Sequence, residues 1–417
     1  MDLDALLVEL GQRSGSDLHL KTGRPPLYRI AGDLLPQTSY PEVSAEEMKA
    51  TMLRLMGPER MRIFLQELES DFSYEIPGYA RFRVNAFIQR GQVGAVMRLV
   101  PLEVPTIEGM GLPEVLKDLC DAANGLVVVT GPTGSGKSTT LAAMIQFINL
   151  KFQSHIVTIE DPIEFVYTDE LCTINQRELG LDTHELHRAL RAALRQDPDV
   201  ILMGEMRDAE TIHFAITAAE TGHLVFSTLH TNDAKQSLDR ILDTFEGPEA
   251  NQVRMQLALT LRGVLSQRLV KRADGQGRTA AMEIMLNTSH IRELIEKGTT
   301  RDLERAIMEG AHYKMQTFNQ ALYALWSKGI ITDAEALAQS SAPEDLQLLM
   351  RGIKRGTSSD EFAAGVLPPA GAKQPTVVGP APSGGKLKTP SSHSLPSTGD
   401  KTLLGPEKKK LSRGFGF

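Results

Sequence analysis

Residues 126–148 read LVVVTGPTGSGKSTTLAAMIQFI, and this stretch decides the fold. The apolar run at 126–129 is short and is bounded by turn residues, as a buried parallel strand is. A glycine-rich turn and then a helical run over 139–148 follow it. The alternation of strand, turn and helix recurs from about residue 114 to 290, and it predicts an α/β domain with a parallel sheet covered by helices.

The turn at 131–138, GPTGSGKS, fits the phosphate-binding pattern GxxxxGK[ST] without deviation. Glycines let backbone N–H groups close around phosphate oxygens, and the N-terminus of the following helix adds its dipole. Lys137 would neutralise charge on the β- and γ-phosphates, and the Ser138 hydroxyl is placed for Mg²⁺. ATP and Mg²⁺ are therefore the expected cofactors. The residues expected to bind ATP are Gly131, Pro132, Thr133, Gly134, Ser135, Gly136, Lys137, Ser138 and Thr139.

A second apolar strand, within DPDVILMGE at 197–205, ends close to the carboxylate of Glu205. Because the ends of parallel strands line one crevice, Glu205 can face the phosphate loop and hold the metal through water. The preceding residue is Gly204, where such a strand usually carries an aspartate. An ordinary acid at the end of a strand is the alternative interpretation, and the residues alone leave both open.

Two further segments lie where strands are expected to end. The segment TIEDPIE at 158–164 follows the strand 155–159 and brings three carboxylates beside the phosphate site. One of them can polarise an attacking water, provided that the metal keeps it ionised. His223 and His230 flank another buried strand. A lone histidine is usually structural, but His230 at the C-terminal end of its strand is better explained as a sensor of the γ-phosphate.

The composition narrows the classes of function. The chain has 417 residues, enough for two to three domains with sizeable cores. Its net charge is −7 and aromatic residues make up 5%, so no nucleic-acid partner is expected. Two cysteines, Cys120 and Cys172, are too few for a zinc site or a disulfide framework. The acidic N-terminus and the absence of a long apolar run favour a cytosolic compartment.

The chain divides into five regions by composition and pattern. Residues 1–100 are predicted to form a small α+β domain, and the proline- and glycine-rich residues 101–113 to form a linker. Residues 114–290 are the predicted α/β core, and residues 291–356 are mostly helical. Residues 357–417 are dominated by Pro, Gly, Ser and Lys and are predicted to be a disordered tail.

Four segments in this order resemble the Walker A, Asp box, Walker B and His box of the secretion ATPases of the type II/type IV pilus superfamily. They read GPTGSGKST, TIEDPIEF, DPDVILMGEMRD and TGHLVFSTLHTNDA. Within that superfamily the chain is most similar to the pilus retraction ATPases of the PilT/PilU family, from the SDLHL strand at 16–20 to about residue 350. The resemblance implies a hexameric ring of subunits, each with an N-terminal PAS-like domain and a RecA-like ATPase domain. It also implies ATP hydrolysis that powers pilus retraction and twitching motility.

The resemblance also implies roles for single residues. Glu164 matches the catalytic base, Glu205 matches the glutamate that supports Mg²⁺, and His223 and His230 match the His-box residues. Family members donate arginines from the N-terminal domain to the phosphates, and Arg83 and Arg98 are the matching candidates. Both lie on alternating segments, 81–87 and 93–100, that suit a hairpin across Gly91, and the residues alone indicate only charges on that hairpin.

The partners and the location also follow from the resemblance. It implies self-association into a homohexamer, contact with an inner-membrane platform protein of the pilus, and a second retraction ATPase as a further partner. The expected location is cytoplasmic, peripheral at the inner membrane and at the base of the pilus.

Principal and accessory retraction motors both remain open. HIRELIEK at 290–297 keeps only part of a C-terminal motif of PilT-type proteins, and the segments 261–269, 315–322 and 344–348 look more like PilU. Residues 206–208, in contrast, follow the PilT pattern. Two other functions are alternatives. An assembly ATPase of pilus extension or type II secretion usually carries a tetracysteine zinc insertion, and a low-turnover nucleotide-binding scaffold would brace a partner motor.

Overall fold

The structure is a computed structural model that describes residues 1–30, 32–100 and 103–353. The predicted tail at 357–417 lies outside the described residues. Two β-sheets organise the described part of the chain, one of six strands and one of seven. No helix in the described ranges is long and apolar enough to cross a lipid bilayer.

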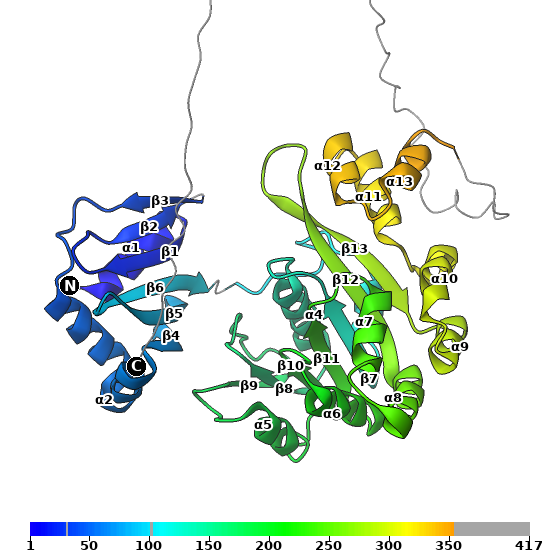
Figure 1. Ribbon diagram of the computed structural model, residues 1–417, viewed down its shortest axis with the longest axis horizontal. Helices are drawn as coiled ribbons and strands as arrows, with labels where there is room; N and C mark the ends of the chain where they lie inside the picture. The colour runs from blue at the N-terminus through cyan, green and yellow to red at the C-terminus, as the bar shows by residue number, and fades with distance from the viewer. Residues whose placement is uncertain (31, 101–102, 354–417) are drawn as a thin grey trace, which may run out of the picture. The chain divides into compact units, whose positions relative to one another are not determined.

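The N-terminal sheet is antiparallel throughout and has the strand order β3-β2-β1-β6-β5-β4 (Figure 1). Its hydrophobic core is separate from that of the second sheet and includes side chains of both helices of this region. The elements are α1 (Leu3–Gln12), β1 (Gly15–Lys21), β2 (Leu27–Ile30), β3 (Asp33–Pro36), α2 (Ala45–Glu67), β4 (Glu69–Ile76), β5 (Ala80–Gln89) and β6 (Gln92–Val100).

Local sequence explains how these elements begin and turn. The side chain of Asp2 accepts a hydrogen bond from the backbone at the start of α1, and Ser44 forms a capping box with Glu47 at the start of α2. The hairpin between β5 and β6 turns at Arg90 and Gly91, whose φ angles are 49° and 74°. Left-handed backbone at both positions matches the twist of the two strands. The predicted hairpin across Gly91 is therefore present.

The second sheet has the order β13-β12-β7-β11-β10-β8-β9, with every neighbouring pair parallel except β12 and β13. Its elements are α3 (Val115–Cys120), β7 (Gly125–Thr130), α4 (Lys137–Lys151), β8 (His155–Glu160), β9 (Thr173–Glu178), α5 (Leu186–Ala193), β10 (Val200–Met203), α6 (Ala209–Glu220), β11 (Leu224–Leu229), α7 (Ala234–Leu242), α8 (Gly247–Thr260), β12 (Leu261–Lys271) and β13 (Arg278–Leu286).

Helices cover both faces of this sheet, as a continuous apolar strand requires. Alternate residues of β7 contribute to two separate hydrophobic clusters. Val127 and Val129 share one cluster with residues of α3 and α4, while Leu126 and Val128 share the other with residues of α5 to α8. Because every residue of β7 is buried, the strand carries no polar alternation in its sequence.

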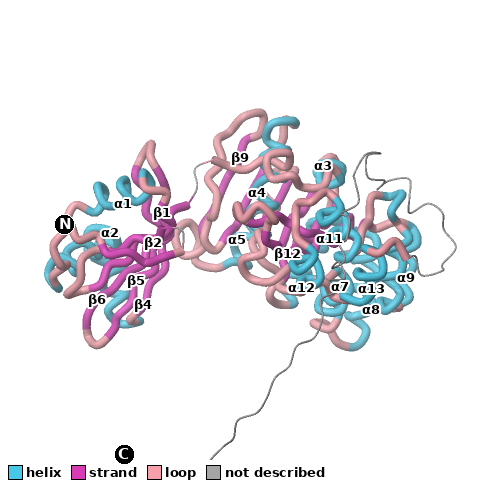
Figure 2. Tube along the Cα trace, turned by 90° about the horizontal axis from the view of Figure 1, so that it is seen from above, coloured by secondary structure: helices cyan, strands magenta, loops and turns pink. Residues whose placement is uncertain are grey.

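Helices dominate the rest of the described chain, as predicted (Figures 1 and 2). They are α9 (Ser289–Lys297), η1 (Thr300–Asp302), α10 (Leu303–Glu309), η2 (Ala311–Tyr313), α11 (Phe318–Ser327), α12 (Asp333–Gln339) and α13 (Pro343–Met350). The last three form a small cluster of their own with Val270 of β12 and Ala281 of β13. This cluster places α12 beside the strand that borders β7.

Candidate functional site

The phosphate loop connects β7 to α4, and its glycines are required by close contacts. Gly131 has a φ of 142°, and a Cβ atom there would lie 2.3 Å from the carbonyl oxygen of Gln267. Gly136 has a φ of 90°, and its Cβ would lie 2.8 Å from Nε2 of the same glutamine. The loop can therefore pack against β12 only with glycine at these two positions.

Lys137 is the first residue of α4, and its side chain folds back over the loop. Its Nζ donates to the carbonyl oxygens of Gly131 at 2.8 Å and Pro132 at 3.2 Å, and it lies 3.3 Å from Nδ1 of His230. Burial lowers the pKa of the Lys137 ammonium, while the carboxylates of Glu205 and Glu164 act in the opposite direction. The two predicted acids thus act on the lysine electrostatically.

Glu205 and His230 follow neighbouring parallel strands, β10 and β11, at the same edge of the sheet. Oε1 of Glu205 lies 3.4 Å from Nε2 of His230, and Oε2 accepts a hydrogen bond from Nε of Arg207 at 2.8 Å. The Thr228 hydroxyl donates to the carbonyl oxygen of Gly204 at 2.7 Å and holds the turn after β10. Lysine, histidine and glutamate therefore form one contiguous polar group.

The Asp box follows β8 and contributes two different glutamates. Glu160 accepts hydrogen bonds from the Thr158 hydroxyl at 2.7 Å and from Gln176 at 3.3 Å. Burial raises the pKa of its carboxyl, and these hydrogen bonds act against that rise. Glu164 is exposed instead, four residues further along the chain. Of these two glutamates, Glu160 has a buried carboxyl group and Glu164 is open to solvent.

Three of the predicted site residues lie elsewhere. His223 precedes β11 at its N-terminal end, where its Nδ1 lies 2.8 Å from the carbonyl oxygen of Ala218. The six residues of β11 separate it from His230, and seven residue steps along a strand span about 23 Å. Arg83 and Arg98 pair directly across β5 and β6, and Arg98 donates to the buried carboxylate of Asp17 at 2.8 Å. The single chain does not bring these three side chains to Lys137.

The structure also adds residues that sequence reasoning missed. Gln267 is fully buried in β12, and its Oε1 accepts a hydrogen bond from the Thr140 hydroxyl of α4 at 2.7 Å. Within the described residues, its Nε2 and the Ser135 hydroxyl are buried without a partner, next to the loop. The separation of 127 positions between Gln267 and Thr140 explains why no local pattern indicated the pair. Arg207, two residues after Glu205, is a further charged neighbour that was not assigned to the site.

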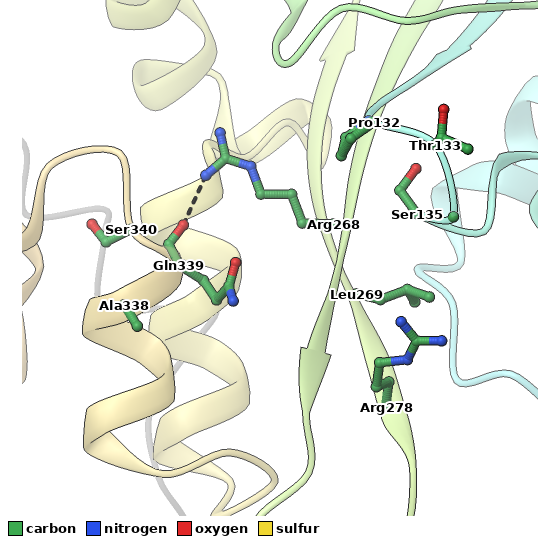
Figure 3. A pocket seen from close by; sticks show the side chains of 10 residues that line it. Pro132, Thr133, Ser135, Arg268, Leu269, Arg278, Ala338, Gln339 and Ser340 are labelled. Atoms are coloured by element: carbon green, nitrogen blue, oxygen red, sulfur yellow. Dashed lines mark hydrogen bonds between the residues drawn. The ribbon is translucent and has the colours of Figure 1, made fainter. Parts of the chain in front are cut away.

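A cavity of about 420 Å³ opens beside the phosphate loop (Figure 3). Arg268 donates from Nη1 to the carbonyl oxygen of Gln339 in α12 at 2.7 Å, and its guanidinium lies 4.1 Å from the centre of the Phe318 ring. The cavity is therefore bounded by the phosphate loop, by β12 and β13, and by the C-terminal helices. Its lining comprises Pro132, Thr133, Gly134, Ser135, Arg268, Leu269, Arg278, Ala338, Gln339 and Ser340.

Comparisons with known proteins identify the family of this chain. Residues 2–337 match the family described as "Type II/IV secretion system protein". The "Type IV pilus retractation ATPase PilT" of Pseudomonas aeruginosa is 47% identical over 83% of this chain and 100% of its own length. The "Type IV pilus ATPase PilU" of the same organism is 43% identical over 86% of this chain and 93% of its own length. A solved structure of the "Pilus Retraction Motor PilT and Bound ADP" is 42% identical, with a TM-score of 0.78, and the match covers 83% of this chain and 99% of that one.

Proposed function

Since the chain belongs to the type II/IV secretion system protein family, and within it to the PilT and PilU ATPases, we propose that it hydrolyses ATP to power retraction of a type IV pilus. The observation that carries the proposal is the polar group at the carboxyl edge of the sheet. There Lys137 of the phosphate loop lies beside His230, and His230 lies beside Glu205, each pair within hydrogen-bonding or ion-pairing distance. The solved PilT structure with bound ADP supports nucleotide binding by this chain.

The proposed chemistry assigns one task to each residue. Backbone N–H groups of residues 131–136 and the Lys137 ammonium bind the β- and γ-phosphates. Glu164 orients a water for in-line attack on the γ-phosphate, and His230 responds to the loss of that phosphate. Arg83 and Arg98 close over the phosphates from the N-terminal sheet. Release of those contacts after hydrolysis lets the N-terminal and ATPase domains rotate against each other.

Mg²⁺ fits the oxygen donors at this edge of the sheet. The half-buried Ser138 follows Lys137 in the first turn of α4 and carries a hydroxyl group. The carboxylate of Glu205 belongs to the same polar group, because it lies next to His230. Hydroxyl and carboxylate oxygens, completed by water and phosphate oxygens, are the ligands that Mg²⁺ prefers. Bound Mg²⁺ would neutralise charge that develops on the phosphate oxygens.

The adenosine end of the nucleotide is proposed to enter the cavity beside the loop. That cavity contacts the loop on one side and carries two guanidinium groups, Arg268 and Arg278, on the other. An arginine plane can stack on a base or bind ribose oxygens. Arg278→Ala should then raise the KM for ATP several-fold and leave kcat nearly unchanged, because the contact is made equally before and in the transition state.

The proposed assembly is a homohexamer on the cytoplasmic side of the inner membrane, at the base of the pilus. The ring would act on a membrane-embedded platform protein, and a second retraction ATPase would be a further partner. The relatives named PilT and PilU support this arrangement, since both are matched along most of their own length. An assembly ATPase of the extension or secretion type is less well supported, because two cysteines cannot build the tetracysteine insertion that those proteins usually carry.

The experiment that tests the function is retraction in a strain that lacks the gene, complemented with wild type or Lys137→Ala. The proposal expects piliated but non-retracting cells after deletion, and restored twitching with the wild type. Restoration by the wild type alone identifies a principal motor. If Lys137→Ala also restores retraction while a second retraction ATPase is present, the chain is the accessory motor. Normal retraction in the deletion strain, or loss of pili, would contradict the proposal.

A further inference from the structure

A buried carboxylate next to the Asp box has no task in the proposed chemistry. Glu178 is the last residue of β9, the edge strand of the ATPase sheet, and its side chain is 3% exposed. In the parallel register of β8 and β9 it pairs with Glu160. A buried glutamate is costly unless its oxygens are hydrogen-bonded and its charge is balanced, so its partners indicate what it does.

The first partner of Glu178 is the loop that carries Glu164. Oε2 of Glu178 accepts a hydrogen bond from the backbone N–H of Ile163 at 3.2 Å. Ile163 is buried, whereas Glu164, the next residue, is exposed. Fixing the peptide just before Glu164 fixes the direction in which the exposed carboxylate leaves the backbone.

The same strand secures the rest of that loop through a neutral side chain. Oε1 of Gln176 accepts from the backbone N–H of Tyr167 at 2.9 Å, and its Nε2 donates to the carbonyl oxygen of Phe165 at 2.8 Å. The loop is therefore attached to β9 on both sides of Glu164. The attachment at Ile163 uses the charged Glu178, and the same carboxylate also contacts the N-terminal sheet.

The second set of partners comes from the N-terminal sheet. Nη2 of Arg81 in β5 lies 2.5 Å from Oε2 of Glu178, and the Ser73 hydroxyl in β4 lies 2.8 Å from both carboxylate oxygens. The Arg81 side chain is itself 13% exposed, so the ion pair is shielded from water. One buried carboxylate thus joins Arg81 to the backbone next to Glu164.

We propose that Glu178 is a positioning residue, which holds the Glu164 loop in its hydrolytic geometry and makes that geometry depend on Arg81 of the N-terminal sheet. This rests on the proposed role of Glu164. Displacement of Arg81 relative to β9 would remove the charge balance of Glu178 and release the Ile163 N–H. The loop would then lose the orientation of Glu164 without any change at the phosphate loop.

The test measures ATP turnover and nucleotide binding of the full-length chain carrying Glu178→Gln, which keeps the shape of the side chain and removes its charge. We expect kcat to fall about 10-fold, because a small misplacement of the reacting groups costs one to two orders of magnitude. The KM for ATP and the binding of a fluorescent nucleotide should stay within about two-fold, since Lys137 is untouched. Glu170→Gln is the matched control, since Glu170 is an exposed carboxylate in the same β8–β9 connection.

A double variant separates positioning from general support of the fold. If Glu178 acts through Glu164, then Glu164→Gln and the pair Glu164→Gln/Glu178→Gln should have the same kcat. Arg81→Gln should reproduce the kcat loss of Glu178→Gln, which gives a second variant if the first is poorly folded. Wild-type kcat in both single variants, or equal losses in kcat and nucleotide binding, would overturn the proposal. Wild-type turnover in Glu164→Gln would instead contradict the assignment of the base.

Discussion

Nδ1 of His230 lies 3.3 Å from Nζ of Lys137, although the two residues are 93 positions apart in the sequence. An ammonium group has donors and no acceptor, so Nδ1 must be the acceptor and the ring proton is on Nε2. That nitrogen is 3.4 Å from Oε1 of Glu205. His230 therefore connects the group that binds phosphate to the group proposed to support the metal, and its tautomer is determined by the lysine.

Loss of the His230 ring should reduce hydrolysis more than nucleotide binding. We expect His230→Ala to lower kcat about 100-fold, the usual effect of removing one group aligned with charge that develops in the transition state. Nucleotide affinity should change little, because the loop and Lys137 remain. Steady-state turnover and equilibrium binding of a fluorescent nucleotide measure the two effects. His213→Ala, at an exposed histidine on α6, is the control.

His223 supplies a separate comparison on the same strand. In a single chain it lies about 23 Å from His230, so its loss should not disturb Lys137 or Glu205 of its own subunit. A kcat loss in His223→Ala comparable to that in His230→Ala would mean that His223 serves a site completed by a neighbouring subunit. Turnover of both variants should be measured below and above the concentration at which rings assemble. The comparison distinguishes a His223 without a task in hydrolysis from one that completes a neighbouring subunit's site.

Arg207 is expected to compete with the metal for Glu205. Its Nε donates to Oε2 of Glu205 at 2.8 Å, and its side chain is 63% exposed. An exposed ion pair of this kind contributes about 0–1 kcal/mol, so Arg207→Ala should lower the Mg²⁺ concentration for half-maximal turnover by about two- to five-fold. A Mg²⁺ titration at fixed ATP measures the shift. An unchanged or higher half-maximal concentration would contradict the competition, and Arg191→Ala, at another exposed ion-paired arginine, should have no effect.

The sequence alone predicts those elements whose pattern is local. The strand before Gly131, the loop and α4 form one continuous stretch, and each part restricts the conformation of the next. The β5–β6 hairpin follows from alternating side chains and Gly91 at its turn. The placement of Glu205 and His230 at one edge was also predictable, because both follow buried strands in a parallel sheet.

Contacts between distant segments could not be predicted in this way. Glu178 ends an ordinary alternating strand, and its partner Arg81 is 97 residues away, so no periodicity relates them. Gln267 lies under the phosphate loop because β12 is the neighbour of β7 in the sheet. That strand order cannot be deduced from a local pattern. His223 is the reverse case: its motif groups it with His230, but strand β11 separates the two side chains within one chain.

The two arginines of the N-terminal hairpin should affect turnover in the same direction. Arg83 and Arg98 face each other across β5 and β6, and both are exposed. If they close over the phosphates, Arg83→Ala and Arg98→Ala should each lower kcat by at least about 10³-fold, as loss of an arginine that completes a phosphoryl-transfer site does. Arg90→Ala, at the exposed tip of the same hairpin, should keep wild-type kcat. Equal kcat in all three variants would mean that neither Arg83 nor Arg98 acts on the phosphates.

Glu283 should make stability depend on pH near neutrality. This carboxyl lies in β13, is 6% exposed, and accepts a hydrogen bond from the backbone N–H of Ala234 at 2.8 Å. Burial raises the pKa of Glu283 from 4.5 to about 7, and the Ala234 hydrogen bond opposes the rise. Between pH 4.5 and 7 the folded chain therefore retains a proton that the unfolded chain has lost. The stability that protonated Glu283 contributes to the folded state is present in full below pH 4.5 and is lost as the pH rises through 7.

Glu283→Gln isolates this contribution, because glutamine keeps the acceptor for the Ala234 N–H and does not titrate. The stability of the wild type relative to Glu283→Gln should fall by on the order of 3 kcal/mol as the pH rises from about 4.5 to 8. Thermal unfolding of the two proteins at a series of pH values measures the difference, and Glu249→Gln, at an exposed carboxylate, is the control. If the melting temperatures of the two proteins change in parallel across this pH range, water reaches Glu283 and stabilises its carboxylate in the folded state.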